Sequence, residues 1–303
     1  MVLFSLILTL LGCSAHKVGA GSGDSADSAP VDLDPMVSSY IPDNFGTMSP
    51  ARVVFLGDSI TAGYGASKRK LSYPRLLKEN DDATWADAAD LDFPGLYGAD
   101  PDILDVSVPG ATTGSLVGEQ LPAVTSGLGD TVSGPTIVIA TIAGNDVQAV
   151  MLSPDQADAA IASITANLTQ FYDYFADPVR FPDGSFVYLA NVYEPSDGVG
   201  QADECFYGLD LTSALGTLDK VNAATLAQAQ DRGVAWIDMH GHFLGHGYHA
   251  SDPTNPYYEA ADPSLWFASD CIHPNDRGHH EIRRLFWYAL AGQDFPGDVP
   301  EPG

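Results

Sequence analysis

Residues 52–61 read RVVFLGDSIT, an apolar run followed by a short polar segment. The apolar run that ends at Gly57 is short and rich in β-branched and aromatic side chains, which predicts a buried strand rather than a helix. Asp58 and Ser59 would then lie directly beyond the carboxyl end of that strand. The sequence therefore predicts a strand that delivers two polar side chains to one edge of a sheet.

Four further apolar runs predict strands, and amphipathic patterns between them predict helices. The strand candidates are residues 103–108, 136–143, 186–192 and 234–237. Apolar side chains recur at helical spacing in residues 161–175, 215–229 and 282–290. Alternating strands and helices indicate an α/β fold with three layers, in which a doubly wound, mostly parallel five-stranded sheet carries helices on both faces. We expect one domain over residues 50–293, with polar loops at its rim over residues 81–102 and 240–262.

Four polar blocks follow the predicted strands or precede the last helix. They are residues 57–61, 109–112, 143–146 and 270–274. Ligands of open parallel sheets bind beyond the carboxyl ends of the strands. We therefore expect the four blocks to converge on one rim.

The blocks contain complementary groups for attack on a carbonyl. The Ser59 hydroxyl needs a base, for which His273 is the candidate, and Asp270 lies close enough in sequence to fix the tautomer of that imidazole. The N–H groups of Ser59 and Gly110 and the side-chain amide of Asn145 could stabilise an oxyanion. At Gly110 no Cβ would obstruct the substrate oxygen.

Taken in order, the four blocks resemble the motif blocks of the SGNH hydrolases, also called GDSL-type esterases and lipases, over about residues 52–287. The resemblance implies an SGNH, flavodoxin-like fold. It also implies a catalytic set of Ser59, Asp270 and His273, an oxyanion hole of Ser59, Gly110 and Asn145, and no metal or cofactor. The third block of the family usually begins with Gly, where this chain has Ala143. A lone Gly-Asp-Ser is a weak signal, because Ser25 lies in the same tripeptide without a preceding strand.

The N-terminus resembles that of a bacterial lipoprotein. Its apolar run is too short to span a bilayer and has the length of a signal-peptide core. The run ends in Leu10-Leu11-Gly12-Cys13, which resembles a lipobox. We therefore expect a signal peptide over residues 1–12, lipidation of Cys13, a flexible acidic tether over residues 13–49, and a C-terminal tail over residues 294–303. The expected location is the bacterial cell envelope. Plain secretion and an unprocessed N-terminus are the alternatives.

Export would also decide the redox environment of the two remaining cysteines. In an oxidising compartment Cys205 and Cys271 could form a disulfide. Two buried thiols are the alternative.

The charge of the chain excludes several classes of partner. It has 13 Lys and Arg against 40 Asp and Glu, a formal net charge of −27. Such a surface repels nucleic acid and anionic lipid. We expect a neutral ester substrate (a small acyl ester, an acetylated glycan or a lipid) and contact with a membrane only through the lipid anchor.

Two other functions remain open. The first is a non-catalytic surface lipoprotein that binds glycans on the same fold. The second is a metal-dependent hydrolase whose ligands would come from one histidine-rich segment: His240, His242, His246, His249 and Asp252. We favour reading that segment as a polar glycine-rich loop.

Four aromatic and histidine residues lie near the last block. His279 and His280 begin the last helix, and we expect them to cap or pack. Trp266 and Phe267 either wall the substrate pocket or bury their own loop.

Overall fold

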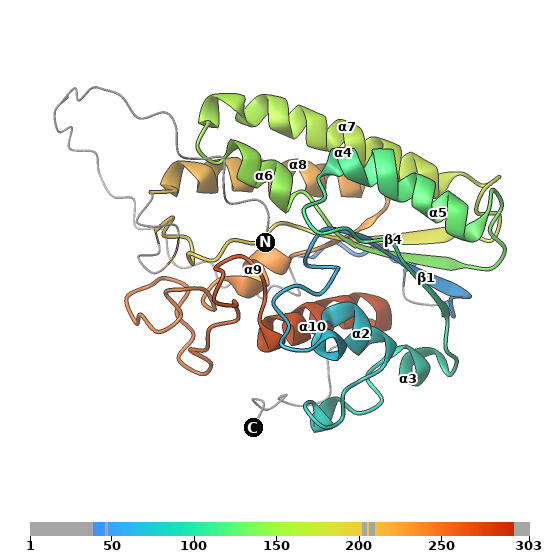
Figure 1. The fold of residues 1–303 in the computed structure, drawn as a ribbon, viewed down its shortest axis with the longest axis horizontal. Coiled ribbons are helices and arrows are strands. Elements are labelled where there is room, and N and C mark those ends of the chain that lie inside the picture. The colour runs from blue at the N-terminus through green and yellow to red at the C-terminus, as the bar shows by residue number, and fades with distance from the viewer. Residues whose placement is uncertain (1–38, 46–47, 202–204, 206–209, 294–303) are drawn as a thin grey trace. The chain divides into compact units, whose positions relative to one another are not determined.

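The computed structural model describes residues 39–45, 48–201, 205 and 210–293. Within this part of the chain, five strands form an all-parallel sheet in the order β2-β1-β3-β4-β5 (Figure 1). The strands are β1 (Arg52–Gly57), β2 (Asp102–Asp105), β3 (Thr136–Thr141), β4 (Ser185–Ala190) and β5 (Ala235–Ile237). The predicted α/β fold with a parallel five-stranded sheet is confirmed.

The order of the strands places a switch point between β1 and β3. From β1 the chain first adds β2 on one side, then crosses back to add β3 on the other side and continues outward. The connections that leave β1 and β3 therefore diverge to opposite faces, which opens a crevice at their carboxyl ends. The polar residues that follow these two strands lie at that crevice.

Helices cover both faces of the sheet (Figure 1). One face carries α4 (Thr113–Ser115), α5 (Leu121–Leu128), α6 (Gly144–Val150), α7 (Ala157–Ala176) and α8 (Thr212–Arg232). The other carries α2 (Tyr73–Lys78), α3 (Phe93–Tyr97), α9 (Met239–Phe243) and α10 (Asp276–Ala291). Shorter helical turns span Arg69–Leu71, Ala86–Ala88, Leu116–Gln120 and Pro154–Gln156.

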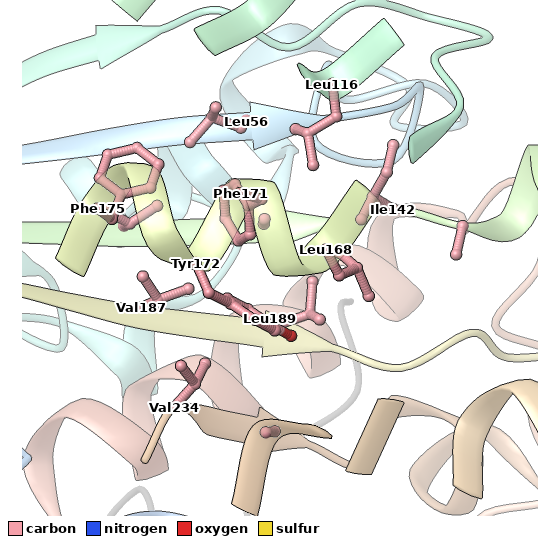
Figure 2. Close-up of a cluster of buried hydrophobic side chains, with 14 of the residues drawn as sticks. Leu56, Leu116, Ile142, Leu168, Phe171, Tyr172, Phe175, Val187, Leu189 and Val234 are labelled. Carbon is pink, nitrogen blue, oxygen red and sulfur yellow. The ribbon is translucent and has the colours of Figure 1, made fainter. Parts of the chain in front are cut away.

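Alternate side chains of each strand enter two separate cores. Val54 and Leu56 of β1 are buried in the cluster under α5, α7 and α8, whereas Val53 and Phe55 are buried in the cluster under α2 and α10. Side chains of α7 and of the strands meet in the first cluster, as Figure 2 shows. Burial on both faces explains why β1 and β3 read as continuous apolar runs.

The long helices match the sequence prediction, and the short ones do not. The three predicted patterns correspond to α7, α8 and α10. The stretches predicted as rim loops contain α3 and part of α9, so that expectation was wrong there. Helices of five to seven residues make too few turns to show a period in the sequence.

The folded body begins before residue 50. Tyr40 pairs with Trp236 through two backbone hydrogen bonds of 2.8 and 2.7 Å, and the ring of Phe45 packs edge-on against Tyr188. Residues 39–45, which the sequence assigned to the tether, therefore pack on the sheet. The predicted signal peptide, Cys13, most of the tether and the C-terminal tail lie outside the described residues.

No helix in the described ranges combines the length and the apolarity needed to cross a membrane.

Candidate active site

Ser59 lies in the turn that leaves the carboxyl end of β1. The turn is tight because Gly57 has a φ of +127° and lies against β3, where an added Cβ would come within 2.1 Å of the Thr141 carbonyl oxygen. The buried Gln120 side chain accepts from the Gly57 N–H and donates to its carbonyl oxygen, both at 2.8 Å. The Ile60 N–H donates to the Asp58 carboxylate at 3.0 Å. These contacts fix the backbone on which the Ser59 hydroxyl is presented.

The imidazole of His273 bridges Ser59 and Asp270. His273 Nε2 lies 2.8 Å from Ser59 Oγ, and His273 Nδ1 lies 2.6 Å from Asp270 Oδ2. The second carboxylate oxygen of Asp270 accepts from the N–H groups of Ile272 and His273 at 3.1 and 3.0 Å. The structure therefore brings together the three residues that the sequence proposed as a catalytic set.

Asp270 is held in its ionised form. Partial burial raises the pKa of this carboxyl. The hydrogen bonds from the His273 N–H, the His273 side chain and the Ile272 N–H together lower the pKa by more than burial raises it, so it lies below the usual value. An ionised carboxylate on Nδ1 keeps the proton there, which leaves Nε2 free to accept the proton of Ser59.

The expected oxyanion groups lie on neighbouring turns. The Asn145 side chain, at the start of α6, donates to the carbonyl oxygen of Ala111 at 2.9 Å, which ties the third block to the second. Gly110 has a φ of +81° and faces open space. Among the described residues, neither the Ser59 N–H nor the Gly110 N–H has an acceptor in the protein. Both amides and the second N–H of Asn145 are thus available to a ligand.

Asp146 holds the two blocks together. Its carboxylate accepts from the backbone N–H of Thr113 at 2.9 Å and from the Thr113 hydroxyl at 2.8 Å. Burial raises the pKa of this carboxyl. Asp146 therefore positions the turn that follows Gly110.

Ala143 occupies a position that suits glycine. It has a φ of +86° and is buried at the start of α6. A residue with a Cβ is strained in this left-handed conformation. The structure thus explains why the family usually has Gly there, and it shows that Ala143 keeps the turn in the form that presents Asn145.

A pocket of about 140 Å³ lies beside Ser59 and Asn145. It is bounded by the start of α6, by α8 and by the segment that follows β4. Most of the side chains that line it are apolar. The reacting hydroxyl therefore lies next to a mostly apolar pocket.

The turn that carries His273 is tied to the rest of the molecule by three contacts. Cys271 forms a disulfide with Cys205, with a Cα–Cα distance of 5.8 Å. The Tyr193 hydroxyl donates to the Ile272 carbonyl oxygen at 2.7 Å, and the Tyr248 hydroxyl donates to that of Ala268 at 2.9 Å. Sequence reasoning did not identify the two tyrosines, because no local pattern shows which backbone group a distant hydroxyl reaches.

The histidine-rich segment does not form a metal site. The described residues contain no group of three or more His, Cys, Asp or Glu that could hold a metal ion. Each member of the segment has a partner of its own: Asn222 for His240, Glu281 for His242, Trp266 for His246, the Gln201 carbonyl for His249 and Thr254 for Asp252.

The other aromatic and histidine residues near the last block pack inside the protein. His279 is buried, which lowers its pKa to about 4, and its Nε2 lies 2.8 Å from the Tyr64 carbonyl oxygen. His280 stacks on Trp85. Trp266 and Phe267 belong to the buried cluster under α10 and are absent from the described lining of the pocket, so they bury their own loop.

The sequence model of the GDSL-like lipase/acylhydrolase family matches residues 55–281. No curated protein matches the chain.

Several solved structures share the fold. An extracellular lipase from Streptomyces rimosus has a TM-score of 0.52 and 21% identity, covering 80% of this chain and 98% of its own. An acetyl xylan esterase has a TM-score of 0.51 and 18% identity, with coverage of 79% and 99%. A catalytic mutant of an acetylxylan esterase from Geobacillus stearothermophilus has a TM-score of 0.50 and 16% identity, with coverage of 82% and 96%. These likenesses establish the fold.

The resemblance noted in the sequence is thus confirmed at the level of the family. Because the family model spans most of the chain, from within β1 to within α10, the chain belongs to the GDSL-like lipase/acylhydrolase family and is a hydrolase that acts on esters.

Proposed function

We propose that the chain hydrolyses neutral carboxylic esters through an acyl-enzyme on Ser59. The observation that carries the proposal is the continuous set of contacts from Ser59 Oγ through His273 Nε2 and Nδ1 to the Asp270 carboxylate. In this arrangement a weak nucleophile lies within hydrogen-bond reach of a base whose orientation a third group fixes.

Acylation begins when Ser59 Oγ attacks the ester carbonyl carbon. His273 Nε2 takes the hydroxyl proton as the bond forms, and Asp270 stabilises the resulting imidazolium. The oxyanion accepts hydrogen bonds from the Ser59 and Gly110 N–H groups and from Asn145 Nδ2. When the tetrahedral intermediate collapses, Nε2 returns the proton to the departing alcohol.

Deacylation repeats these steps with water. His273 Nε2 removes a proton from the water as its oxygen attacks the acyl carbon. The second tetrahedral intermediate uses the same oxyanion donors, and Ser59 Oγ leaves with the proton from Nε2. The products are the free acid and the restored enzyme, and no metal or redox step is needed to balance the reaction.

The direct test is the Ser59→Ala variant, assayed on p-nitrophenyl butyrate. We expect kcat to fall by about 10⁴-fold or more, since removal of the nucleophile from a serine hydrolase has that scale of effect. Ser25→Ala is the matched control and should keep full activity. Full activity in Ser59→Ala would refute the proposal.

The preference for neutral esters follows from the charge near the site. Glu194 lines the pocket, the ionised Asp270 adjoins it, and the chain as a whole carries −27. An anionic acyl group would be repelled in such a field. We expect p-nitrophenyl butyrate to be hydrolysed faster than the half-ester p-nitrophenyl succinate, by a factor that shrinks as salt is added.

We also propose that Cys13 anchors the chain to a bacterial envelope membrane. The support is the lipobox-like Leu10-Leu11-Gly12-Cys13. In a bacterial host that processes lipoproteins, we expect a mature N-terminus at a lipidated Cys13, seen by mass spectrometry, and loss of membrane association in Cys13→Ala. A mature protein that still contains residues 1–12 would contradict this.

A further inference from the structure

The pocket beside Ser59 has the chemistry of a chain-binding site. At its entrance it is lined by Ser59 and Asn145, which hold the reacting carbonyl in the proposed mechanism. Beyond these two residues, the walls of the pocket are formed by Val147 from α6 and by Ala214 and Leu218 from α8. A group attached to the carbonyl carbon can therefore enter the pocket without moving the carbonyl from the oxyanion donors.

The buried polar groups of the pocket are already satisfied by the protein. Asn191 donates to Asp238 at 2.7 Å and accepts from the His240 N–H at 2.7 Å. The Glu194 carboxylate accepts from the N–H groups of Ser196 and Gly198, each at 2.6 Å. What these residues leave for a ligand is apolar surface, and burying a hydrocarbon there is favourable.

The leaving alcohol has a different place. It must lie within reach of His273 Nε2, which protonates it. His273 is absent from the described lining of the pocket, and its ring lies 5.5 Å from that of Tyr64, whose side chain is 52% exposed. The alcohol therefore faces Tyr64 and solvent, and the pocket is left to the acyl side of the ester.

The size of the pocket limits the length of that acyl chain. Its volume of about 140 Å³ is close to that of an apolar cavity of about 150 Å³ that holds benzene, a six-carbon ligand. An acetyl group would leave most of the space empty. A chain of sixteen carbons would extend well beyond it.

We propose that the pocket binds the acyl chain, so that the enzyme prefers esters of medium-chain acids, with about four to eight carbons, over acetyl esters. This inference rests on the proposed function. Each methylene that enters an apolar pocket contributes up to about fourfold in binding. We expect kcat/KM to rise from acetate to hexanoate by one to two orders of magnitude and to fall again at palmitate.

Two isomeric esters separate the acyl side from the alcohol side. Ethyl hexanoate and hexyl acetate have the same composition, and only the position of the chain differs. We expect ethyl hexanoate to be hydrolysed at least tenfold faster in kcat/KM. Equal rates, or a preference for hexyl acetate, would overturn the proposal.

Substitutions in the pocket test the same point on the protein. Ala214→Phe should fill the pocket and lower kcat/KM for p-nitrophenyl hexanoate by tenfold or more, and by a smaller factor for the acetate. The control is Ala227→Phe on the same helix, where the side chain is exposed. If Ala214→Phe fails to fold, Met151→Ala, which enlarges the pocket, should move the optimum to longer chains.

The outcomes separate the two proposals. An enzyme that prefers acetyl esters, or a pocket variant that changes all chain lengths alike, refutes the acyl pocket and leaves the Ser59 mechanism standing. An enzyme that hydrolyses no ester of any length refutes the mechanism itself.

Discussion

The Tyr193 hydroxyl donates a hydrogen bond of 2.7 Å to the carbonyl oxygen of Ile272, the residue immediately before His273. Tyr193 follows β4 and is itself held by stacking on Phe243, with ring centroids 4.8 Å apart. The buried Tyr193 side chain thus connects the end of β4 to the turn that presents the imidazole. The position of His273 depends on this contact as well as on Asp270.

Removal of the hydrogen bond from Tyr193 to Ile272 should affect turnover more than substrate binding. In Tyr193→Phe the ring remains and only the hydrogen bond is lost, which is worth about 0.5–1.5 kcal/mol. We expect kcat on p-nitrophenyl acetate to fall by about 2- to 10-fold, with KM nearly unchanged. Tyr248→Phe should also lower kcat, because Tyr248 holds Ala268, whose N–H donates to the His273 carbonyl oxygen at 2.8 Å. An unchanged kcat in Tyr193→Phe would show that the hydroxyl does not position the imidazole.

The Cys205–Cys271 disulfide should support activity through the same turn. Cys271 lies between Asp270 and His273 and has a φ of +64°, which is unfavourable for a residue with a Cβ. Replacing both cysteines with Ser should lower kcat and destabilise the protein by about 2–5 kcal/mol.

A matched pair of double variants separates the two effects. Cys205→Ser with Cys271→Gly loses the disulfide but allows the positive φ, so it should retain more activity than Cys205→Ser with Cys271→Ser. Kinetics alongside circular dichroism at the same temperature measure this. Equal activity in the two double variants would show that the backbone at Cys271 is not under strain that matters for catalysis.

The Asn145 side chain should contribute to the transition state. Its loss in Asn145→Ala removes one proposed oxyanion donor, which typically costs 10²- to 10³-fold in kcat. We expect KM to change little, because the contact strengthens as the oxyanion forms. Gln148→Ala is a suitable control, since Gln148 lines the pocket from the same helix and is exposed. Steady-state kinetics in which Asn145→Ala and Gln148→Ala behave alike would contradict the assignment.

Asp58 should make stability depend on pH. Burial raises its pKa to about 7, while hydrogen bonds from the Ile60 N–H and Thr141 only partly oppose the shift. In the unfolded chain this carboxyl titrates near 3.8. Between these values the folded state keeps a proton that the unfolded state has lost, so the free energy of unfolding falls as pH rises from about 4 to 7.

The Asp58→Asn variant tests this linkage. The amide oxygen can still accept both hydrogen bonds, but no charge is buried. The free energy of unfolding of Asp58→Asn relative to wild type should therefore increase by a few kcal/mol between pH 4 and pH 8. Denaturant unfolding at both pH values measures it, with the exposed Asp130→Asn as the control. A difference between variant and wild type that does not change with pH would mean that Asp58 is already ionised in the folded protein at low pH.

The parts of the fold that the sequence predicted share one property. Strands β1, β3, β4 and β5 bury most of their side chains, and α7, α8 and α10 each bury an apolar face, so these elements show as apolar patterns along the chain. The short helices α3 and α9 depend on local caps, since the Asp92 and Asp238 side chains accept from the N–H groups of Gly95 and Gly241. A cap of this kind looks like any polar turn in the sequence.

The residues of the site also divide into those that the sequence shows and those that only the structure shows. Ser59, Gly110, Asn145, Asp270 and His273 lie in short motifs, so they could be named before the structure was known. Gln120 and Tyr193 act on backbone groups 63 and 79 residues away, and nothing in their own neighbourhood indicates that role. The pocket likewise depends on which faces of α6 and α8 meet, which only the packed structure shows.

In the proposed mechanism Ser59 carries the acyl group during turnover. Acid-quenching the enzyme milliseconds after mixing with p-nitrophenyl butyrate, followed by peptide mass spectrometry, measures this most directly. We expect a butyryl adduct on the peptide that contains Ser59 and none on the peptide that contains Ser25. Turnover with an unmodified Ser59, or an adduct on another residue, would contradict it.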